Sequence, residues 1–227
     1  MTSARKNFSY LFKILVVLCS LGGVTLSLAQ AHHDGFSHWA KRLLYFTAQS
    51  NLWIGITCLL LLFLPFLYPS EKTVQRLYLL KFVFTVSIAV TCLVFCGLLG
   101  PFADKSMHPW SFSSFLTHVF SPIFALIDYF LDPYPIKLKK GQFVLALLPP
   151  LFYVLIASIL NLQGIDFGRG DPYPYFFLHY RSPVGLFGFS NAFPFYAGTF
   201  YWLALFAFVV FIIAGLFSKA KSHEKKR

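Results

Sequence analysis

The sequence predicts an all-α integral membrane protein, with six transmembrane helices packed in one bundle. Hydrophobic residues fill 57% of the 227 positions and charged residues only 12%, a balance that a soluble domain of this size cannot bury. A helix needs about 20 apolar residues to cross the hydrocarbon core of a bilayer. Six segments meet this requirement, at about 10–30, 43–67, 78–101, 112–131, 143–161 and 198–217. Helices are expected because each satisfies its own backbone hydrogen bonds in lipid.

The six segments are expected to form one domain, residues 1–227. Prolines fall near the ends of the segments and between them, where helices are expected to stop: Pro65, Pro69, Pro101, Pro133, Pro135 and Pro194. The first segment has a second interpretation. Basic residues precede an apolar stretch that ends in Ala29-Gln30-Ala31, which is the pattern of a cleaved signal peptide. Cleavage would leave five spans with unchanged orientation.

Basic residues are unevenly divided between the two sides of the predicted bundle. Six spans put both termini on one side, and 14 of the 19 lysine and arginine residues fall there when loops 68–77 and 132–142 are included. Cytoplasmic loops are enriched in these residues, so we expect both termini in the cytoplasm and the first segment retained. The same rule explains the net charge of +11, so no nucleic-acid partner is expected. No metal site or cofactor is expected, since the four cysteines lie in apolar spans and the histidines fit no ligand spacing.

The segment 162–197 differs from the other connections. It is long, nearly neutral and rich in glycine, proline and aromatic residues. A long connection without regular structure in a compact protein is often functional. We expect this aromatic outer loop to cap the bundle on the side opposite the termini.

Two polar side chains within the apolar segments suggest chemistry. Thr47 lies about one turn into the second segment, and His118, the only histidine well inside a segment, lies between one and two turns into the fourth. Both segments run inward from the outer side, so at ~1.5 Å per residue both residues lie in the outer third of the bilayer. Ionisable groups inside a membrane are expensive to bury and often functional. A hydroxyl nucleophile and an imidazole base are the minimum set for acyl transfer.

Other polar residues surround this pair in the sequence. Ser50 and Asn51 share a helix face with Thr47, and Ser121 shares one with His118, so these three are candidate supporting or oxyanion-stabilising groups. Pro122 removes the helical donor for the carbonyl of His118, which predicts a kink and a free acceptor there. In membrane helices, serine and threonine also commonly bond to backbone carbonyls or join helices, which is the structural alternative for Thr47.

A second pair of ionisable residues is expected to be structural. Lys81 and Asp128 lie near the inner ends of the third and fourth segments, which face the same side, so an ion pair between them is predicted. It lies far from the outer pair of polar residues.

Three short motifs occur in an order that resembles a known family: Tyr45-Phe46-Thr47 with Ser50 and Asn51; Thr117-His118-Val119-Phe120-Ser121-Pro122 followed by Asp128; and Tyr173-Pro174-Tyr175-Phe176-Phe177-Leu178-His179. Together they are similar to the androgen-induced family of small multi-pass membrane hydrolases and its bacterial relatives. The resemblance implies that Thr47 and His118 are the catalytic pair and that the substrates are fatty acid esters of hydroxy fatty acids. The likeness to bacterial members implies the plasma (inner) membrane of a bacterium, with the active site on the non-cytoplasmic side.

The chain departs from that family at two places. In the animal enzymes the proline after the histidine falls one residue later than Pro122, and their aromatic loop is more compact than 162–197. Both differences bear on the pocket, so the resemblance does not transfer the identity of the substrate.

The leading hypothesis is an intramembrane lipid ester hydrolase with Thr47 as nucleophile and His118 as base. Gln49, Tyr173, Tyr175 and His179 are expected to line the substrate pocket. No carboxylate lies at the depth of His118, so a backbone carbonyl, or Asp166 or Asp171 from the loop, must orient its ring. The alternative is a non-catalytic protein that binds or senses lipid in the same pocket. A haem protein is disfavoured because no second histidine lies in a span, and a transporter because no inverted repeat is visible.

Overall fold

The computed structural model describes residues 3–103, 108–134, 138, 139, 141–192 and 194–224. Six of the basic residues counted above lie outside these ranges: Lys105, Lys137, Lys140, Lys225, Lys226 and Arg227. Within the described ranges, six helical spans are long and apolar enough to cross a membrane: Ser3–Ala29, Phe46–Phe66, Glu71–Phe102, Phe112–Leu131, Gln142–Leu162 and Thr199–Lys221. The prediction of an all-α protein with six membrane-spanning helices is confirmed.

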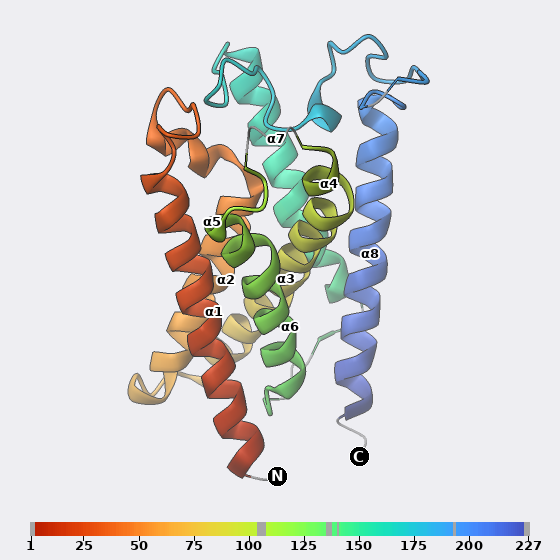
Figure 1. Ribbon diagram of the computed structural model, residues 1–227. Helices are drawn as coiled ribbons and strands as arrows, with labels where there is room; N and C mark the ends of the chain where they lie inside the picture. The colour runs from red at the N-terminus through yellow and green to blue at the C-terminus, as the bar shows by residue number, and fades with distance from the viewer. Residues whose placement is uncertain (1–2, 104–107, 135–137, 140, 193, 225–227) are drawn as a thin grey trace.

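The six spans run up and down, so that both termini lie at the same end of the bundle (Figure 1). The α-helices are α1 (Ser3–Ala29), α2 (Phe46–Phe63), α3 (Glu71–Val94), α4 (Gly100–Phe102), α5 (Phe112–Phe115), α6 (Ser121–Leu131), α7 (Leu148–Leu162) and α8 (Thr199–Glu224). Short 3-10 helices cover Trp39–Leu44, Leu64–Phe66, Gln142–Leu147 and Phe176–Leu178. Pro65 lies in the turn that ends the second span, as its missing amide hydrogen favours.

Helices α1, α2, α3 and α6 form the tightly packed part of the bundle. Two glycines of this part lie where no larger side chain fits. A Cβ atom on Gly55 of α2 would lie 2.3 Å from the Ser20 hydroxyl of α1, and one on Gly23 of α1 would lie 2.8 Å from the Thr117 side chain. Small residues commonly allow such close approach in membrane proteins, where dispersion contacts rather than water exclusion join helices.

Two spans widen into a single π-helical turn, at Phe95–Leu99 and at Leu116–Phe120. In each case a proline follows two residues after the π turn, Pro101 and Pro122 respectively. Proline has no amide hydrogen, and its ring collides with the carbonyl four residues earlier. A wider turn relieves this collision. The sequence predicted a kink with a free acceptor at His118; the structure shows a π turn that contains this histidine. Such turns are frequent at functional sites.

A buried ionic cluster joins α1, α3 and α6 toward the end that holds the termini. The Lys81 ammonium lies 2.5 Å from the Asp128 carboxylate, which confirms the predicted pair. Asp132 lies 2.6 Å from Lys81, and Lys13 bridges both carboxylates at 2.9 and 2.7 Å. The Ser9 hydroxyl also donates to Asp128. Lys81 and Asp128, the pair predicted from the sequence, are two of the four charged residues in this cluster.

Candidate active site

Thr47 and His118 meet at the end of the bundle opposite the termini. The Thr47 Oγ1 atom lies 3.2 Å from His118 Nε2, which is within hydrogen-bonding distance. Thr47 is the second residue of α2, so its hydroxyl lies at the mouth of the span rather than deep inside it. His118 lies in the middle of the second π turn. Two residues 71 positions apart are therefore placed as a nucleophile and base require.

The orientation of the His118 ring is fixed on three sides. Its Nδ1 atom lies 3.0 Å from the carbonyl oxygen of Ser114, which can only accept a hydrogen bond. The proton of a neutral ring therefore sits on Nδ1, and Nε2 presents a lone pair to the Thr47 hydroxyl. Phe95 of the first π turn stacks on the ring, with centroids 3.6 Å apart and planes 18° apart. A backbone carbonyl thus orients the imidazole, one of the two alternatives that the sequence left open.

The loop carboxylates do not orient the His118 ring. Asp166 forms an ion pair with Lys41 and accepts the amide hydrogen of Gly168. The Lys41 bond and the backbone bonds lower the pKa of this exposed carboxylate. Asp171 lines the cavity described below and is not bonded to His118. Neither residue takes the place of the Ser114 carbonyl.

Residues next to Thr47 in the sequence support its backbone. The Asn51 amide donates to the carbonyls of Thr47 and Thr117, at 2.8 and 3.0 Å, and so joins the segments that carry Thr47 and His118. The Ser50 hydroxyl lies 3.2 Å from the same Thr47 carbonyl and 2.9 Å from Thr91 Oγ1. Both side chains are fully buried behind Thr47. The sequence suggested either a supporting or an oxyanion-stabilising role for these two residues. Their placement fits the supporting role.

Two further candidates lie away from the reacting atoms. Ser121 is fully buried, and its hydroxyl has no hydrogen-bond partner among the described residues. The Gln49 side chain donates to the Leu43 carbonyl and does not line either cavity at the site. The structure therefore does not bring these two residues to the Thr47 hydroxyl.

A chamber of about 570 Å³ opens on the His118 side of the pair. This volume lies in the range of small-molecule sites. Most of the chamber wall is apolar, but charged side chains also line it, unlike the second cavity described below, and it is therefore named the polar chamber. Three of the predicted pocket residues line it, Tyr173, Tyr175 and His179, together with charged residues from two outer loops: Asp34, Arg42, Arg169 and Asp171. Burial lowers the pKa of His179 below its ordinary value, so this ring is neutral at pH 7. The aromatic outer loop thus forms one wall of the chamber.

The loop is held in place by buried aromatic and aliphatic side chains. Phe167 and Leu178 are 0% and 1% exposed. Together with Phe177 they pack against α7 and near α8. The loop is therefore anchored to the bundle where it covers the site.

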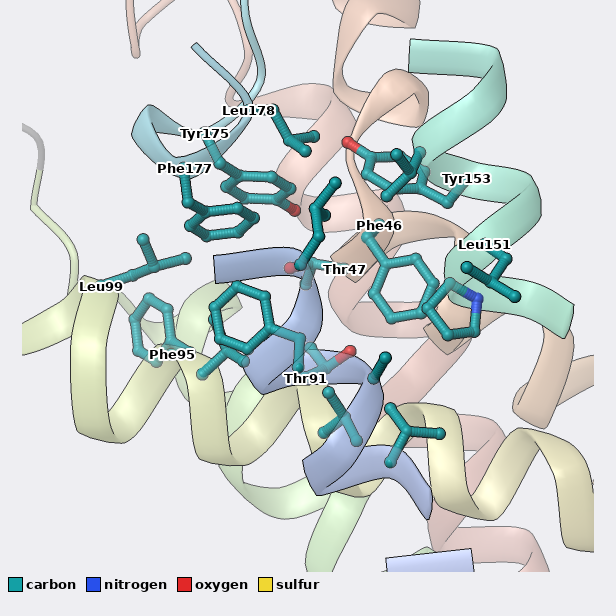
Figure 2. Close-up of a pocket in the computed structure, with 18 of the residues that line it drawn as sticks. Phe46, Thr47, Thr91, Phe95, Leu99, Leu151, Tyr153, Tyr175, Phe177 and Leu178 are labelled. Atoms are coloured by element: carbon teal, nitrogen blue, oxygen red, sulfur yellow. The ribbon is translucent and has the colours of Figure 1, made fainter. Parts of the chain in front are cut away.

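Tyr175 brings a phenol directly to Thr47. Figure 2 shows its oxygen pointing toward the Thr47 side chain. Burial raises the pKa of the phenol, and hydrogen bonds with Thr47 and with the backbone of Phe46 and Thr47 offset this rise in part. These backbone groups belong to the first turn of α2, where amide hydrogens have no partner within the helix. Tyr175 stays protonated at neutral pH and can donate to a charge that forms beside Thr47.

A second, apolar pocket of about 120 Å³ lies on the other side of Thr47 (Figure 2). It is enclosed by side chains of α3, α7, α8 and the outer loop. Thr47, Phe95, Leu99 and Tyr175 line both the pocket and the chamber, whereas His118 lines the chamber alone. Thr47 therefore lies in the wall between the polar chamber and the apolar pocket.

The sequence did not predict the role of Tyr175 at the junction or the second cavity. Both depend on how the outer loop folds back on α2. The spacing of hydrophobic residues in the sequence does not predict how a loop folds. The paired π turns have a signal that can be read in retrospect, a proline at the same distance beyond each turn. Within the described part of the chain, no three His, Cys, Asp or Glu side chains gather as they would to hold a metal ion.

Comparison with known proteins returns no match: no family model, no curated protein and no solved structure is similar to this chain.

Proposed function

We propose that this protein is an intramembrane lipid ester hydrolase in which Thr47 is the nucleophile and His118 the general base. The observation that carries the proposal is the 3.2 Å contact between Thr47 Oγ1 and a histidine whose other nitrogen is held by a backbone carbonyl. That tautomer leaves Nε2 free to take the hydroxyl proton. The position of the pair between a polar chamber and an apolar pocket supports an amphipathic substrate.

The first step forms a bond between Thr47 Oγ1 and the ester carbonyl carbon while the hydroxyl proton moves to His118 Nε2. The charge that develops on the carbonyl oxygen is stabilised by the Tyr175 hydroxyl and by first-turn amide hydrogens of α2. Collapse of this intermediate breaks the bond to the alcohol oxygen, and His118 returns the proton to the leaving alcohol. The products are a free alcohol and an acyl group on Thr47.

The second step releases the acyl group. Water from the polar chamber gives a proton to His118 Nε2 and adds to the acyl carbonyl, which breaks the bond to Thr47 Oγ1. The proton then returns to Thr47, and the carboxylic acid leaves. His118 lines the polar chamber and not the apolar pocket. Water and the base therefore both approach Thr47 from the chamber.

The substrate class follows from the compartments and from the resemblance of the motifs around Thr47 and His118. We propose lipid esters of long-chain acids, with fatty acid esters of hydroxy fatty acids as the first class to examine. We also propose that the protein lies in the plasma (inner) membrane of a bacterium, with the termini in the cytoplasm and the site on the other side. The excess of basic residues on the side of the termini supports this orientation.

The test is hydrolysis of a panel of lipid esters by purified protein in detergent, with Thr47→Ala and His118→Ala beside the wild type. We expect both substitutions to reduce turnover by at least a thousandfold, with an unchanged melting profile. Equal activity in all three proteins would disprove the proposed pair. Lipid binding without hydrolysis, retained in Thr47→Ala, would favour the non-catalytic lipid-binding alternative.

A further inference from the structure

The apolar pocket beside Thr47 is built differently from the rest of the bundle. Its walls come from α3 on one side and from α7 and α8 on the other, while α7 and α8 pack mainly on α3 and the 3-10 helix Gln142–Leu147. Nearly all side chains that line it are aliphatic or aromatic. A pocket with such walls favours an apolar occupant.

One side chain that lines the pocket also lies at the outer surface of the bundle. Leu151 of α7 lines the pocket and yet is 55% exposed. This exposed surface belongs to a membrane-spanning helix, so it faces lipid tails in a bilayer. Thr47 and Tyr175 border the same pocket (Figure 2). The same apolar pocket is therefore lined by a lipid-facing side chain and by Thr47.

We infer that this pocket is the acyl-binding site of the proposed hydrolase, so the inference rests on the proposed function. The acyl chain enters sideways from the bilayer past Leu151 and places its carbonyl at Thr47. The alcohol half of the ester lies on the other side of Thr47, in the polar chamber. It is released through this chamber after the first step. Ala207 of α8 lines the pocket, and its small side chain leaves room for the chain.

The volume sets an expectation for chain length. An apolar cavity of about 150 Å³ holds a benzene ring, so a pocket of about 120 Å³ holds about five carbon atoms. The first carbons of the acyl group are therefore enclosed by protein, and the remainder of a long chain extends past Leu151 into lipid. A larger side chain that fills the pocket is expected to prevent binding of long acyl groups. Binding of an acetyl group is expected to be unchanged.

The experiment compares Ala207→Phe with Ala204→Phe, which makes the same substitution on an exposed face of α8 that does not line the pocket. Each protein in lipid nanodiscs is irradiated with decanoic acid that carries a photoreactive diazirine at carbon 5, and the crosslinks are mapped by mass spectrometry. In the wild type we expect crosslinks on pocket residues of α3 and α8, such as Val94, Leu203 and Ala207. Ala207→Phe is expected to reduce crosslinking in the pocket at least fivefold, and Ala204→Phe to leave it unchanged.

Hydrolysis measured on the same proteins separates this inference from the proposed function. Ala207→Phe is expected to slow hydrolysis of an octanoyl ester at least tenfold and to keep that of an acetyl ester of the same alcohol within twofold. Crosslinks confined to the polar chamber, or equal pocket crosslinks in both variants, overturn the acyl-binding site even if Thr47 is catalytic. Pocket crosslinks that Ala207→Phe removes, in a protein that hydrolyses no ester, support the acyl site and disprove the hydrolase.

Discussion

The two ends of the bundle bury ionisable residues in opposite ways. Toward the termini, Lys13, Lys81, Asp128 and Asp132 lie at most 5% exposed, and every charge has an opposite charge within 2.9 Å. At the other end, the partners of His118 are neutral, namely the Ser114 carbonyl and the hydroxyls of Thr47 and Thr117, and the ring borders a chamber of about 570 Å³. One site is closed and paired, and the other is open on one side.

This difference fits a structural role at the first end and the proposed catalytic role at the second. Taking a charge out of water costs several kcal/mol, which a dense network of opposite charges can offset. Such a network has no room for a substrate and no unpaired group to react with it. His118 keeps one nitrogen directed at a single hydroxyl, with open volume beside it. The surroundings of an ionisable residue in a membrane protein therefore indicate its role better than its presence alone.

The largest expected effect is on stability, at the paired end. Lys81→Met removes one ammonium and leaves two buried carboxylates with a single lysine between them. We expect a loss of about 3–5 kcal/mol, the usual cost when one partner of a buried pair is removed. Thermal unfolding in detergent measures it. Lys72→Met, on an exposed position of the same helix, serves as the control and is expected to leave the melting temperature nearly unchanged.

An equal melting temperature in Lys81→Met and Lys72→Met would show that the ionic cluster does not stabilise the bundle. The comparison between the two ends would then lose its basis.

The next effect is on catalysis, at the open end. Tyr175→Phe keeps the ring and removes the hydroxyl beside Thr47, so we expect hydrolysis to fall about 10²–10³-fold, the usual cost of losing one oxyanion donor. Ester hydrolysis and thermal unfolding are measured together. Tyr180→Phe is the matched control on the same loop, because its hydroxyl donates to Ser158 away from both cavities. Equal activity in the two variants would exclude Tyr175 as a donor to the oxyanion.

The smallest expected effect is on the stability of the fold at low pH. Burial raises the pKa of Asp132, but the ion pairs with Lys81 and Lys13 outweigh this and lower it below the ordinary value of about 3.9. The ion pairs therefore stabilise the fold above pH ~4, and this contribution is lost as pH falls further, through the lowered pKa. We expect the melting temperature to fall as the pH drops below about 4, and to fall less steeply in Asp132→Asn. The same slope in both proteins would assign the acid sensitivity to other carboxylates.

Much of the fold and the centre of the site follow from the sequence. Apolar length identifies all six spans, because each must cross the same thickness of hydrocarbon. Equal depth in two spans of the same direction identified Thr47 and His118, which the structure places in contact. The same reasoning about helix ends identified Lys81 and Asp128.

The remaining parts depend on three-dimensional packing. Lys13 precedes the apolar stretch in a pattern shared with signal peptides, and Asp132 lies just after α6, so neither looked like a partner of Lys81. Tyr175 reaches Thr47 only because the outer loop is anchored by its buried side chains. Helical periodicity carries no information on how such a loop returns to the bundle.

The central claim is that Thr47 carries the acyl group during turnover. The most direct measurement mixes the protein with excess p-nitrophenyl octanoate, stops the reaction with acid within milliseconds, and maps the modified residue by mass spectrometry. We predict an added octanoyl group on Thr47, which is absent in Thr47→Ala and strongly reduced in His118→Ala. Turnover of the ester with the octanoyl group on another residue, or in Thr47→Ala at the wild-type rate, would contradict the claim.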